Sequence, residues 1–145
     1  MALVRELLAR KEARILTIGP SASVLQAALL MNEHRVGSLV VVEDGRVTGM
    51  FTERDVLQRV VAGRRDPEAT RVAEVMTGSV VCCAPETTAD EVRGVMRDRR
   101  IRHLPVVDGA GRLLGVISIG DLNAQLQAAQ EQTVVMLTEY IQGRV

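Results

Sequence analysis

The sequence predicts an α+β fold of two β-α-β-β-α repeats packed sheet to sheet with approximate two-fold symmetry, plus terminal helices. The first observation is an internal repeat: MNEHRVGSLVVVEDGRVTGMFTERDVL at residues 31–57 recurs as MRDRRIRHLPVVDGAGRLLGVISIGDL at residues 96–122. The second is the order within each copy, in which an apolar strand, a glycine turn, a second strand and a helix follow one another. One copy alone would leave a face of its small sheet bare, so the two copies are expected to cover each other.

The first copy, residues 11–63, carries the sequence signals of five elements. Ser23 is a typical N-cap, and apolar residues at helical spacing follow it. Asp44-Gly45 stands between two apolar strand-like runs, which is the pattern of a two-residue hairpin. Gly63 follows the last helix and ends it. The expected elements are a strand, a helix, two hairpin strands and a second helix, at residues 15–18, 24–33, 39–42, 46–51 and 53–62.

The second copy, residues 75–129, follows a polar linker at residues 64–74 that contains Pro67. Its hairpin turn is one residue longer than that of the first copy, because of Ala110. Two further helices are expected outside the repeat, one within residues 1–10 and one within residues 130–145. The expected elements of the second copy are at residues 80–83, 88–99, 104–107, 113–117 and 121–130, and the C-terminal helix is centred on residues 132–141.

The composition excludes several classes of function. The chain has 145 residues with 18 basic and 18 acidic side chains, so its formal charge is zero and a nucleic-acid partner is not expected. Phe51 and Tyr140 are its only aromatic residues, too few for a platform on which bases stack. No apolar run reaches the roughly 18 residues of a membrane span, and the first residues lack the apolar core of a signal peptide. We therefore expect a cytoplasmic protein without a membrane partner.

Cysteine and histidine usage favours neither a redox nor a metal function. Cys82 and Cys83 are adjacent, and neighbours on an extended strand point to opposite faces. We expect both to pack as small apolar residues, the alternative being a thiol redox switch. His34 and His103 are the only histidines and no Cys-x-x-Cys occurs, so no metal site is predicted.

Each copy ends its hairpin with the motif Gly-x-x-Ser/Thr-x-x-Asp. Thr52 and Asp55 carry it in the first copy, and Ser118 and Asp121 carry it in the second. A hydroxyl and an acid at this spacing form a capping box at a helix start, which is the structural interpretation. In the functional interpretation each carboxylate accepts two hydrogen bonds from the vicinal diol of a ribose. The helix N-terminus and nearby basic side chains would then hold an anion.

The duplicated stretches VGSLVVVEDGRVTGMFTERDVL and IRHLPVVDGAGRLLGVISIGDL resemble two cystathionine-β-synthase-type (CBS) domains in tandem, a Bateman module. The resemblance extends over residues 11–126, and residues 130–143 are similar to the tail of small stand-alone bacterial members and their plant mitochondrial relatives. It implies binding of an adenosine-containing ligand: AMP, ADP, ATP, NAD or S-adenosylmethionine. It implies ribose contacts from Thr52, Asp55, Ser118 and Asp121, and phosphate contacts from Arg54, Arg102, His103 and Lys11. It implies two equivalent clefts, with cleft-lining positions at Leu16, Val36, Gly37, Met76, Thr77, Val81, Ile101, Val116 and Gly120. Of these, Leu16, Val36 and Gly37 belong to the cleft of Asp121, and Met76, Thr77, Val81 and Ile101 belong to the cleft of Asp55.

The expected function is regulatory. A ligand that bridges the two copies favours one relative orientation of them, and an effector protein of unknown identity reads this orientation in trans. No enzyme activity is expected, because the sequence has no nucleophile–base pair, phosphate loop or carboxylate cluster. The alternative is a ligand-free structural or protein-interaction module. A homodimer is also expected, and it would bury the apolar stripes at Val56, Val60, Val61, Leu122, Leu126 and Ala129.

Overall fold

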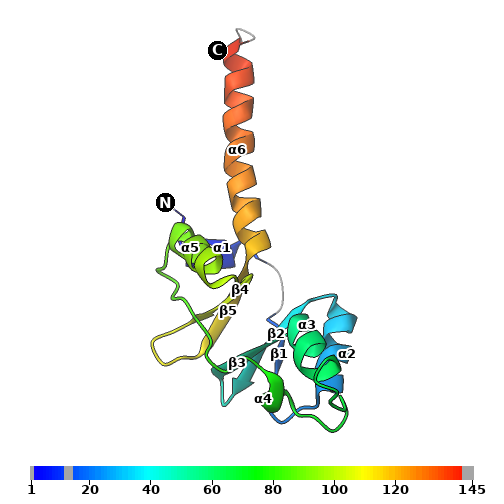
Figure 1. The fold of residues 1–145 in the computed structure, drawn as a ribbon. Helices are drawn as coiled ribbons and strands as arrows, with labels where there is room; N and C mark the ends of the chain where they lie inside the picture. Colours follow the sequence, from blue (N-terminus) through cyan, green and yellow to red (C-terminus); the bar gives the residue numbers. More distant parts are fainter. Residues whose placement is uncertain (1, 12–14, 142–145) are drawn as a thin grey trace.

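The computed structural model describes residues 2–11 and 15–141, with side chains described as far as residue 130. It is an α+β structure of two halves that meet through their sheets, and one long helix projects from the second half (Figure 1). The helices are α1 (Val4–Ala9), α2 (Val24–His34), α3 (Glu53–Asp55), the π-helix η1 (Val56–Val61), α4 (Val72–Val75), α5 (Ala89–Arg99) and α6 (Ile119–Ile141). The strands are β1 (Thr17–Ile18), β2 (Ser38–Glu43), β3 (Arg46–Thr52), β4 (His103–Val107) and β5 (Leu113–Ser118).

Each half contains a small sheet built around one hairpin. In the first half β2 lies between β1, which is parallel to it, and β3, which is antiparallel. In the second half β4 and β5 form an antiparallel pair. Asp44 and Gly45 take φ values of 54° and 79°, as a type I′ turn requires of its two central residues. A register shift next to Val41 recurs next to Val106, so the two hairpins share even their irregularity.

The prediction of a strand at residues 80–83 is wrong. The backbone there makes a single parallel bridge to β4, through Cys83. The difference between the halves lies on the neighbouring strand. In the first half Val40 N donates a hydrogen bond to Leu16 O at 3.3 Å, whereas Pro105, at the equivalent position of β4, has no N–H to donate. The missing donor shortens the ladder to one bridge.

The two halves exchange the segments that lead into them. α1 precedes the first repeat, but Val4 and Leu7 lie in the core of the second half, and Val4 N donates to Thr87 O at 2.8 Å. α4 comes from the linker and packs on the first half, where Val72 N donates to Ala22 O at 2.8 Å. The N-terminal helix, expected outside the repeat, is thus an integral part of the second half.

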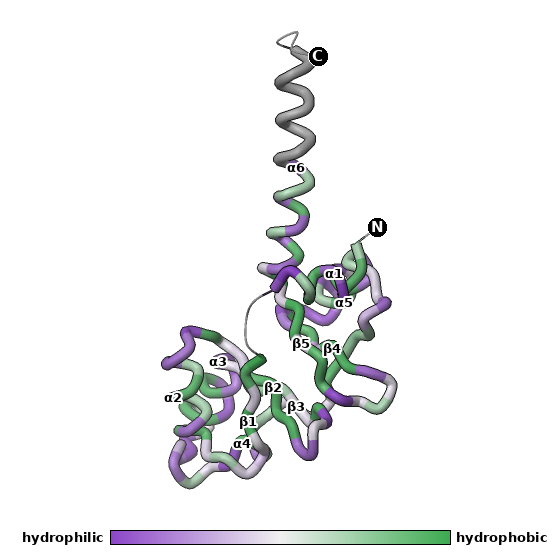
Figure 2. The backbone as a smooth tube through the Cα atoms, turned by 180° about the vertical axis from the view of Figure 1, so that it is seen from behind, coloured by the Kyte–Doolittle hydropathy of each residue, from purple (hydrophilic) through white to green (hydrophobic). Residues whose placement is uncertain are grey.

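Each half has its own hydrophobic core beneath its sheet. Phe51 is fully buried in the first core, and Ile117 and Leu122 are fully buried in the second. The strands are among the most hydrophobic stretches of the chain, as Figure 2 shows. Burial of these side chains supplies most of the stabilisation that a domain of this size needs.

The helices differ from their predicted extents at two places. α6 runs unbroken from Ile119 to Ile141, where two separate helices were predicted. The helix predicted at residues 53–62 starts as α3 and continues as the π-helix η1. Val60 and Leu122, predicted to lie on stripes that a dimer would bury, are 2% and 0% exposed because they belong to the cores. Among the helices of the described part, none is long and apolar enough to cross a bilayer.

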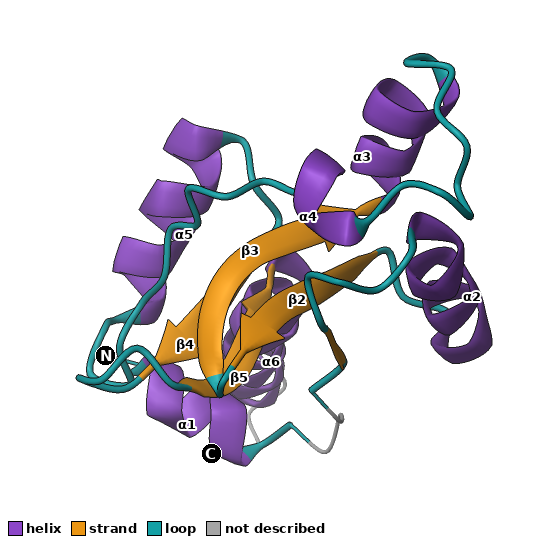
Figure 3. Ribbon diagram, turned by 90° about the horizontal axis from the view of Figure 1, so that it is seen from below, coloured by secondary structure: helices purple, strands orange, loops and turns teal. Residues whose placement is uncertain are grey.

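The halves join where their hairpin turns meet. Val47 N donates to Gly111 O at 3.4 Å, and Leu113 N donates to Gly45 O at 3.3 Å. Figure 3 shows the strands of both halves in the middle of the molecule, with α2 and α5 on opposite outer sides. The capping motifs of Thr52 and Ser118 lie at the opposite ends of β3 and β5, where α3 and α6 begin.

Candidate functional site

A cavity of about 420 Å³ opens between the two halves. The first half contributes residues that lead into β1 and β2, and the second half contributes β5 and the first turn of α6. Aliphatic side chains form most of the wall, and the ionisable side chains Lys11, His103 and Asp121 lie among them. A pocket of this composition suits a ligand with an apolar body and a few polar groups. Its lining is Leu8, Lys11, Ile15, Leu16, Val36, Ser38, Val40, His103, Leu114, Gly115, Val116, Ser118 and Asp121.

Asp121 lies in the first turn of α6 and forms a capping box with Ser118. Ser118 N donates to Asp121 Oδ2 at 2.8 Å, and Asp121 N donates to the Ser118 hydroxyl at 3.1 Å. The Lys11 ammonium donates to the same Oδ2 at 2.8 Å and to Val116 O at 2.7 Å. Within the described residues all side-chain partners of this carboxylate use Oδ2. In that part of the chain Oδ1 has no hydrogen-bond partner.

The surroundings keep the Asp121 carboxylate ionised. Burial raises the pKa of Asp121, but hydrogen bonds from Lys11 and Ser118 outweigh it, and the pKa lies below its usual value. At neutral pH the cavity thus contains a carboxylate paired with an ammonium group. A negative oxygen held this way is a stronger hydrogen-bond acceptor than a neutral one.

His103 begins β4 and lines the same cavity. Burial lowers its pKa, and the positive charges of Lys11 and Arg102 lower it further. The imidazole is therefore neutral at pH 7, so it can donate one hydrogen bond and accept another without adding charge. Arg102 itself is exposed and is not part of the cavity lining.

Asp55 repeats the capping geometry at the start of α3. Thr52 N donates to Asp55 Oδ2 at 3.0 Å, and Asp55 N donates to the Thr52 hydroxyl at 3.3 Å. Its side chain is 9% exposed, against 23% for Asp121, and Arg59 Nε lies 3.7 Å from Asp55 Oδ1. The capping interpretation of the motif therefore holds in both halves, and of the two carboxylates it is Asp121 that lines the cavity.

The structure brings some of the predicted site residues together and leaves others apart. Arg54 is exposed on α3. Met76 and Thr77 lie against β3, where Met50 N donates to Thr77 O at 3.0 Å. Val81 and Ile101 pack against the second core. Seven predicted residues line the cavity: Lys11, Leu16, Val36, His103, Val116, Ser118 and Asp121. The others lie outside its lining: Gly37, Thr52, Arg54, Asp55, Met76, Thr77, Val81, Ile101, Arg102 and Gly120.

Sequence reasoning missed several lining residues. Ser38 and Val40 occupy the positions of the first copy that correspond to His103 and Pro105, so the repeat itself was a signal for them. Leu8 had no such signal, because its place in the cavity depends on α1 packing on the second half. The other missed lining residues are Ile15, Leu114 and Gly115.

A second cavity, of about 620 Å³, lies within the second half beside Cys82 and Cys83. Burial raises the pKa of Cys82, and burial together with Cys82 raises the pKa of Cys83 to about 11. Such thiols are poor nucleophiles and poor metal ligands at neutral pH. In the part of the chain that the structure describes, no three side chains of His, Cys, Asp or Glu come together as they would to hold a metal ion.

Comparison with known proteins decides the family. The sequence profile of the CBS domain matches the chain twice, over residues 4–62 and 72–127. The chain belongs to the CBS domain family. A CBS domain-containing protein of Bacillus subtilis is 38% identical over 109 residues, which make up 75% of this chain and 76% of that protein. A mitochondrial CBS domain-containing protein of Arabidopsis thaliana is 35% identical over 126 residues, or 83% of this chain and 61% of the plant protein.

Solved structures of CBS proteins share the fold. A CBS-domain protein from Burkholderia ambifaria has 40% sequence identity and a TM-score of 0.83, covering 89% of this chain and 96% of its own. A CBS domain protein from Pyrobaculum aerophilum, solved in complex with AMP, has 26% identity and a TM-score of 0.73, covering 82% and 88%. The prediction of a tandem CBS fold is confirmed.

Proposed function

We propose that this CBS pair is a regulatory module that binds an adenosine-containing ligand in the cavity between its repeats. The observation that carries the proposal is Asp121, whose ionised carboxylate has one oxygen left for a ligand in a 420 Å³ cavity with walls from both repeats. A carboxylate so placed can accept hydrogen bonds from a ribose diol. The AMP complex of the Pyrobaculum aerophilum protein supports this ligand class.

The polar and apolar parts of the cavity suggest separate roles. Asp121 and Ser118 would hold the ribose, and Leu16, Val36 and Val116 would pack against the adenine. The Lys11 ammonium and the neutral imidazole of His103 would contact the substituent on the 5′ carbon of the ribose. Arg102, exposed beside His103, would contact a longer phosphate chain. AMP, ADP, ATP, NAD and S-adenosylmethionine share the adenosine part and remain the candidate ligands.

The regulatory role follows from where the cavity lies. A ligand that contacts both repeats stabilises the relative orientation in which it binds best, and it shifts the population by no more than its difference in affinity between orientations. The chain would act on an effector protein in trans, as a cytoplasmic regulator rather than an enzyme. A purely structural or protein-interaction module is the alternative function.

A nucleotide panel separates these two functions. AMP, ATP, NAD and S-adenosylmethionine are added singly in a thermal-shift measurement. A ligand present at about 100 times its Kd adds about 2.7 kcal/mol of stability, which raises Tm by roughly 5–11 °C at about 2–4 °C per kcal/mol. No shift with any of the four supports the structural alternative instead.

Calorimetry then tests the assigned carboxylate. Asp121→Asn keeps the cap but weakens charge-assisted hydrogen bonds to the diol, so affinity should fall about tenfold or more. Asp98→Asn, which changes an exposed acid on α5, is the matched control and should bind as the wild type does. Equal affinity of Asp121→Asn and the wild type would remove Asp121 from the proposal.

The proposal includes a homodimer formed through the helices of the first repeat. Leu57 and Val61 on η1 are each 64% exposed, and Leu29 on α2 is 58% exposed, which is unusual for large apolar side chains on neighbouring helices. A second copy of the chain would cover them in an isologous contact.

Light scattering after size exclusion measures this association. The wild type should have the mass of a dimer, and Leu57→Glu combined with Val61→Glu should have that of a monomer. Gln58→Glu introduces a charge on the same helix outside this apolar pair and should leave the dimer intact. A monomeric wild type, or a double variant that still dimerises, contradicts this surface.

A further inference from the structure

Arg59 connects η1 to the backbone of Val75 and Met76 beside the second capping carboxylate, Asp55. Its Nη1 donates to Val75 O at 3.1 Å and to Met76 O at 3.0 Å, while its Nε lies 3.7 Å from Asp55 Oδ1. One guanidinium group therefore contacts both the carboxylate and the backbone of the segment that faces it. Arginine suits this position because its planar fork presents several donors in fixed directions.

The two capping carboxylates differ in what reaches their second oxygen. In both, Oδ2 accepts the backbone N–H of the cap residue, at 3.0 Å for Asp55 and 2.8 Å for Asp121. Oδ1 of Asp55 faces the Arg59 guanidinium, and the side chain is 9% exposed. Asp121, at 23% exposed, lines the open cavity. The oxygen that a diol would use is thus already approached by a cation in one repeat and left to the cavity in the other.

Met76 and Thr77 also pack closely on β3 of the first repeat at this point. Thr77 N donates to Met50 O at 2.9 Å, and a Cβ placed on Gly49 would lie 2.5 Å from Met76 Sδ. Because Arg59 Nη1 donates a hydrogen bond to the Met76 carbonyl, it stabilises this close contact from the side of η1. Removal of the guanidinium group would free both Asp55 Oδ1 and the backbone opposite it.

The sequence places a different residue at the matching point of the other repeat. Gln125 of α6 corresponds to Arg59, and its neutral amide carries no charge to compensate an acid. The helices differ as well, because η1 is π-helical where α6 is α-helical. π-Helical turns are rare and occur frequently at functional sites.

We infer that Arg59 is a specificity-determining residue that decides which of the two clefts takes a ligand. It holds the Asp55 cleft closed as a latent second site, while the Asp121 cleft stays open, so the wild-type chain binds one ligand. The ligand class assigned to the latent site rests on the proposed function. The closure itself rests on the contacts of Arg59.

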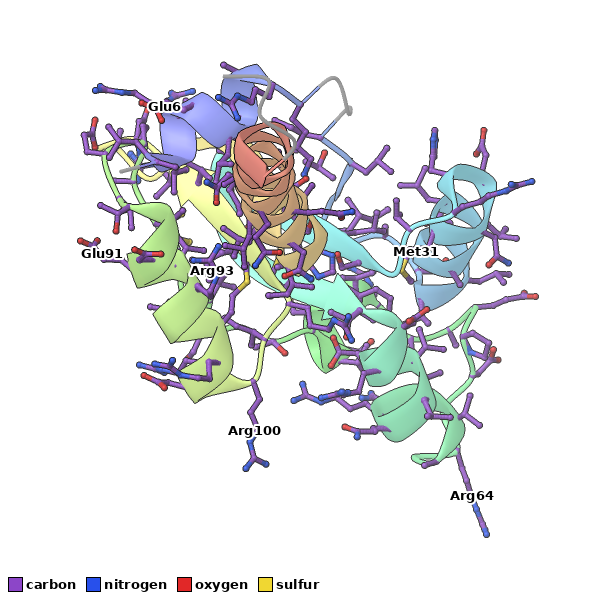
Figure 4. All side chains as sticks on the ribbon, turned by 90° about the horizontal axis from the view of Figure 1, so that it is seen from above. Glu6, Met31, Arg64, Glu91, Arg93 and Arg100 are labelled. Atoms are coloured by element: carbon purple, nitrogen blue, oxygen red, sulfur yellow. The ribbon has the colours of Figure 1, made fainter. Side chains whose placement is uncertain are left out.

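Stoichiometry measured by calorimetry tests this inference, with AMP and S-adenosylmethionine titrated in parallel. Arg59→Met keeps the aliphatic stem and removes the charge, and Arg59→Gln is a second variant in case the first lowers stability. Either variant should bind one ligand per chain more than the wild type, and adding Asp55→Ala should abolish the gain. Arg64→Ala removes an arginine that points away from the body beyond the same helix (Figure 4) and should leave the stoichiometry unchanged.

The change in the number of ligands bound per chain tests this inference independently of the proposed function. A gain of one equivalent that depends on Asp55 supports the closure by Arg59, whatever the wild type binds. No gain with either ligand in folded Arg59→Met and Arg59→Gln overturns it, as does a wild type that already loses one of two equivalents on Asp55→Ala. Binding that is insensitive to Asp121→Asn concerns the proposed function alone.

Discussion

Lys11 and Asp121 form an ion pair across 110 positions of sequence, with 2.8 Å between Lys11 Nζ and Asp121 Oδ2. The pair ties the segment that follows α1 to the first turn of α6, and the same ammonium donates to Val116 O at 2.7 Å. Both side chains line the cavity. The pair therefore sets the charge that a ligand meets and adds a long-range contact to the fold.

The variant Lys11→Met should lose less unfolding free energy than the wild type as the pH falls from neutral to acid. The folded-state pKa of Asp121 is depressed, so its contribution is present above the unfolded pKa near 4 and is lost as pH falls through the folded value. Without Lys11 the depression shrinks, and less stability is lost below about pH 4. Urea unfolding at several pH values between 7 and 3 measures the slope of the unfolding free energy against pH.

The exposed Arg10→Met variant is the control for that slope, since it removes a neighbouring positive charge that has no contact with the carboxylate among the described residues. Lys11→Met should also lower the unfolding free energy at pH 7 by about 1 kcal/mol, as expected for a partly buried charged hydrogen bond. A slope equal to that of the wild type contradicts the role given to Lys11.

The substitutions Gly49→Ala and Gly115→Ala occupy equivalent positions and should differ in cost. A Cβ on Gly49 would lie 2.9 Å from Thr77 O, a backbone atom held in a bridge to β3. A Cβ on Gly115 would meet Leu8 Cδ2 at 2.6 Å, which is the end of a flexible side chain. We expect Gly49→Ala to cost about 1–3 kcal/mol of unfolding free energy and Gly115→Ala to cost less.

Paired urea-unfolding curves of the two variants give the comparison directly, each variant serving as the control for the other. The reverse order would mean that the backbone at Thr77 shifts more easily than the Leu8 side chain. Such a result would also weaken the closed geometry described for the Asp55 cleft, because Thr77 lies next to Met76, whose carbonyl accepts from Arg59.

The repeat in the sequence was sufficient to predict the hairpins and both capping boxes. It also predicted two equivalent clefts between the halves, and the structure has a cavity lined by Asp121, whereas Asp55 lies outside that lining. It was not sufficient for features that depend on contacts between distant segments. The position of α1 on the second half depends on backbone hydrogen bonds such as that of Val4 to Thr87, which no local pattern encodes. The hydrogen bond from Arg59 Nη1 to Met76 O likewise joins η1 to the start of the second repeat, and no local pattern in the sequence indicates that contact.

One failed prediction had a signal in the sequence. Pro105 stands where Val40 stands in the first repeat, and the absence of its N–H is enough to shorten the neighbouring strand. The unequal clefts had a weaker signal of the same kind, because Arg59 and Gln125 differ at equivalent positions. Residue differences at equivalent positions of the two repeats thus predict where the halves differ in structure. The contacts that these residues make are seen only in the structure.

Two arginines end helices in a conformation that suits glycine. Arg35 (φ 54°, ψ 45°) follows α2, and Arg100 (φ 55°, ψ 42°) follows α5 at the equivalent position. Both are exposed, and Arg100 points into solvent (Figure 4). Arg35→Gly and Arg100→Gly should each raise the unfolding free energy by about 1 kcal/mol, because glycine takes the left-handed conformation without a Cβ penalty.

Thermal and urea unfolding measure this gain, and Arg99→Gly is the matched control. Arg99 is the last residue of α5, so glycine there should lower stability by about 1 kcal/mol through its poor helix propensity. If Arg100→Gly and Arg99→Gly change stability in the same direction, the left-handed strain is not what the substitution relieves.

The thiols of Cys82 and Cys83 should react slowly in the folded protein. Cys83 is 8% exposed and its pKa is raised to about 11, so only about one thiol in a thousand is ionised at pH 8. Labelling with iodoacetamide at pH 8, followed by peptide mass spectrometry, should modify Cys83 far more slowly than in the urea-unfolded chain. Cys82, which is less buried, should react at an intermediate rate. Rapid labelling of both residues, or a Cys82–Cys83 disulfide formed under mild oxidation, would favour the redox switch over core packing.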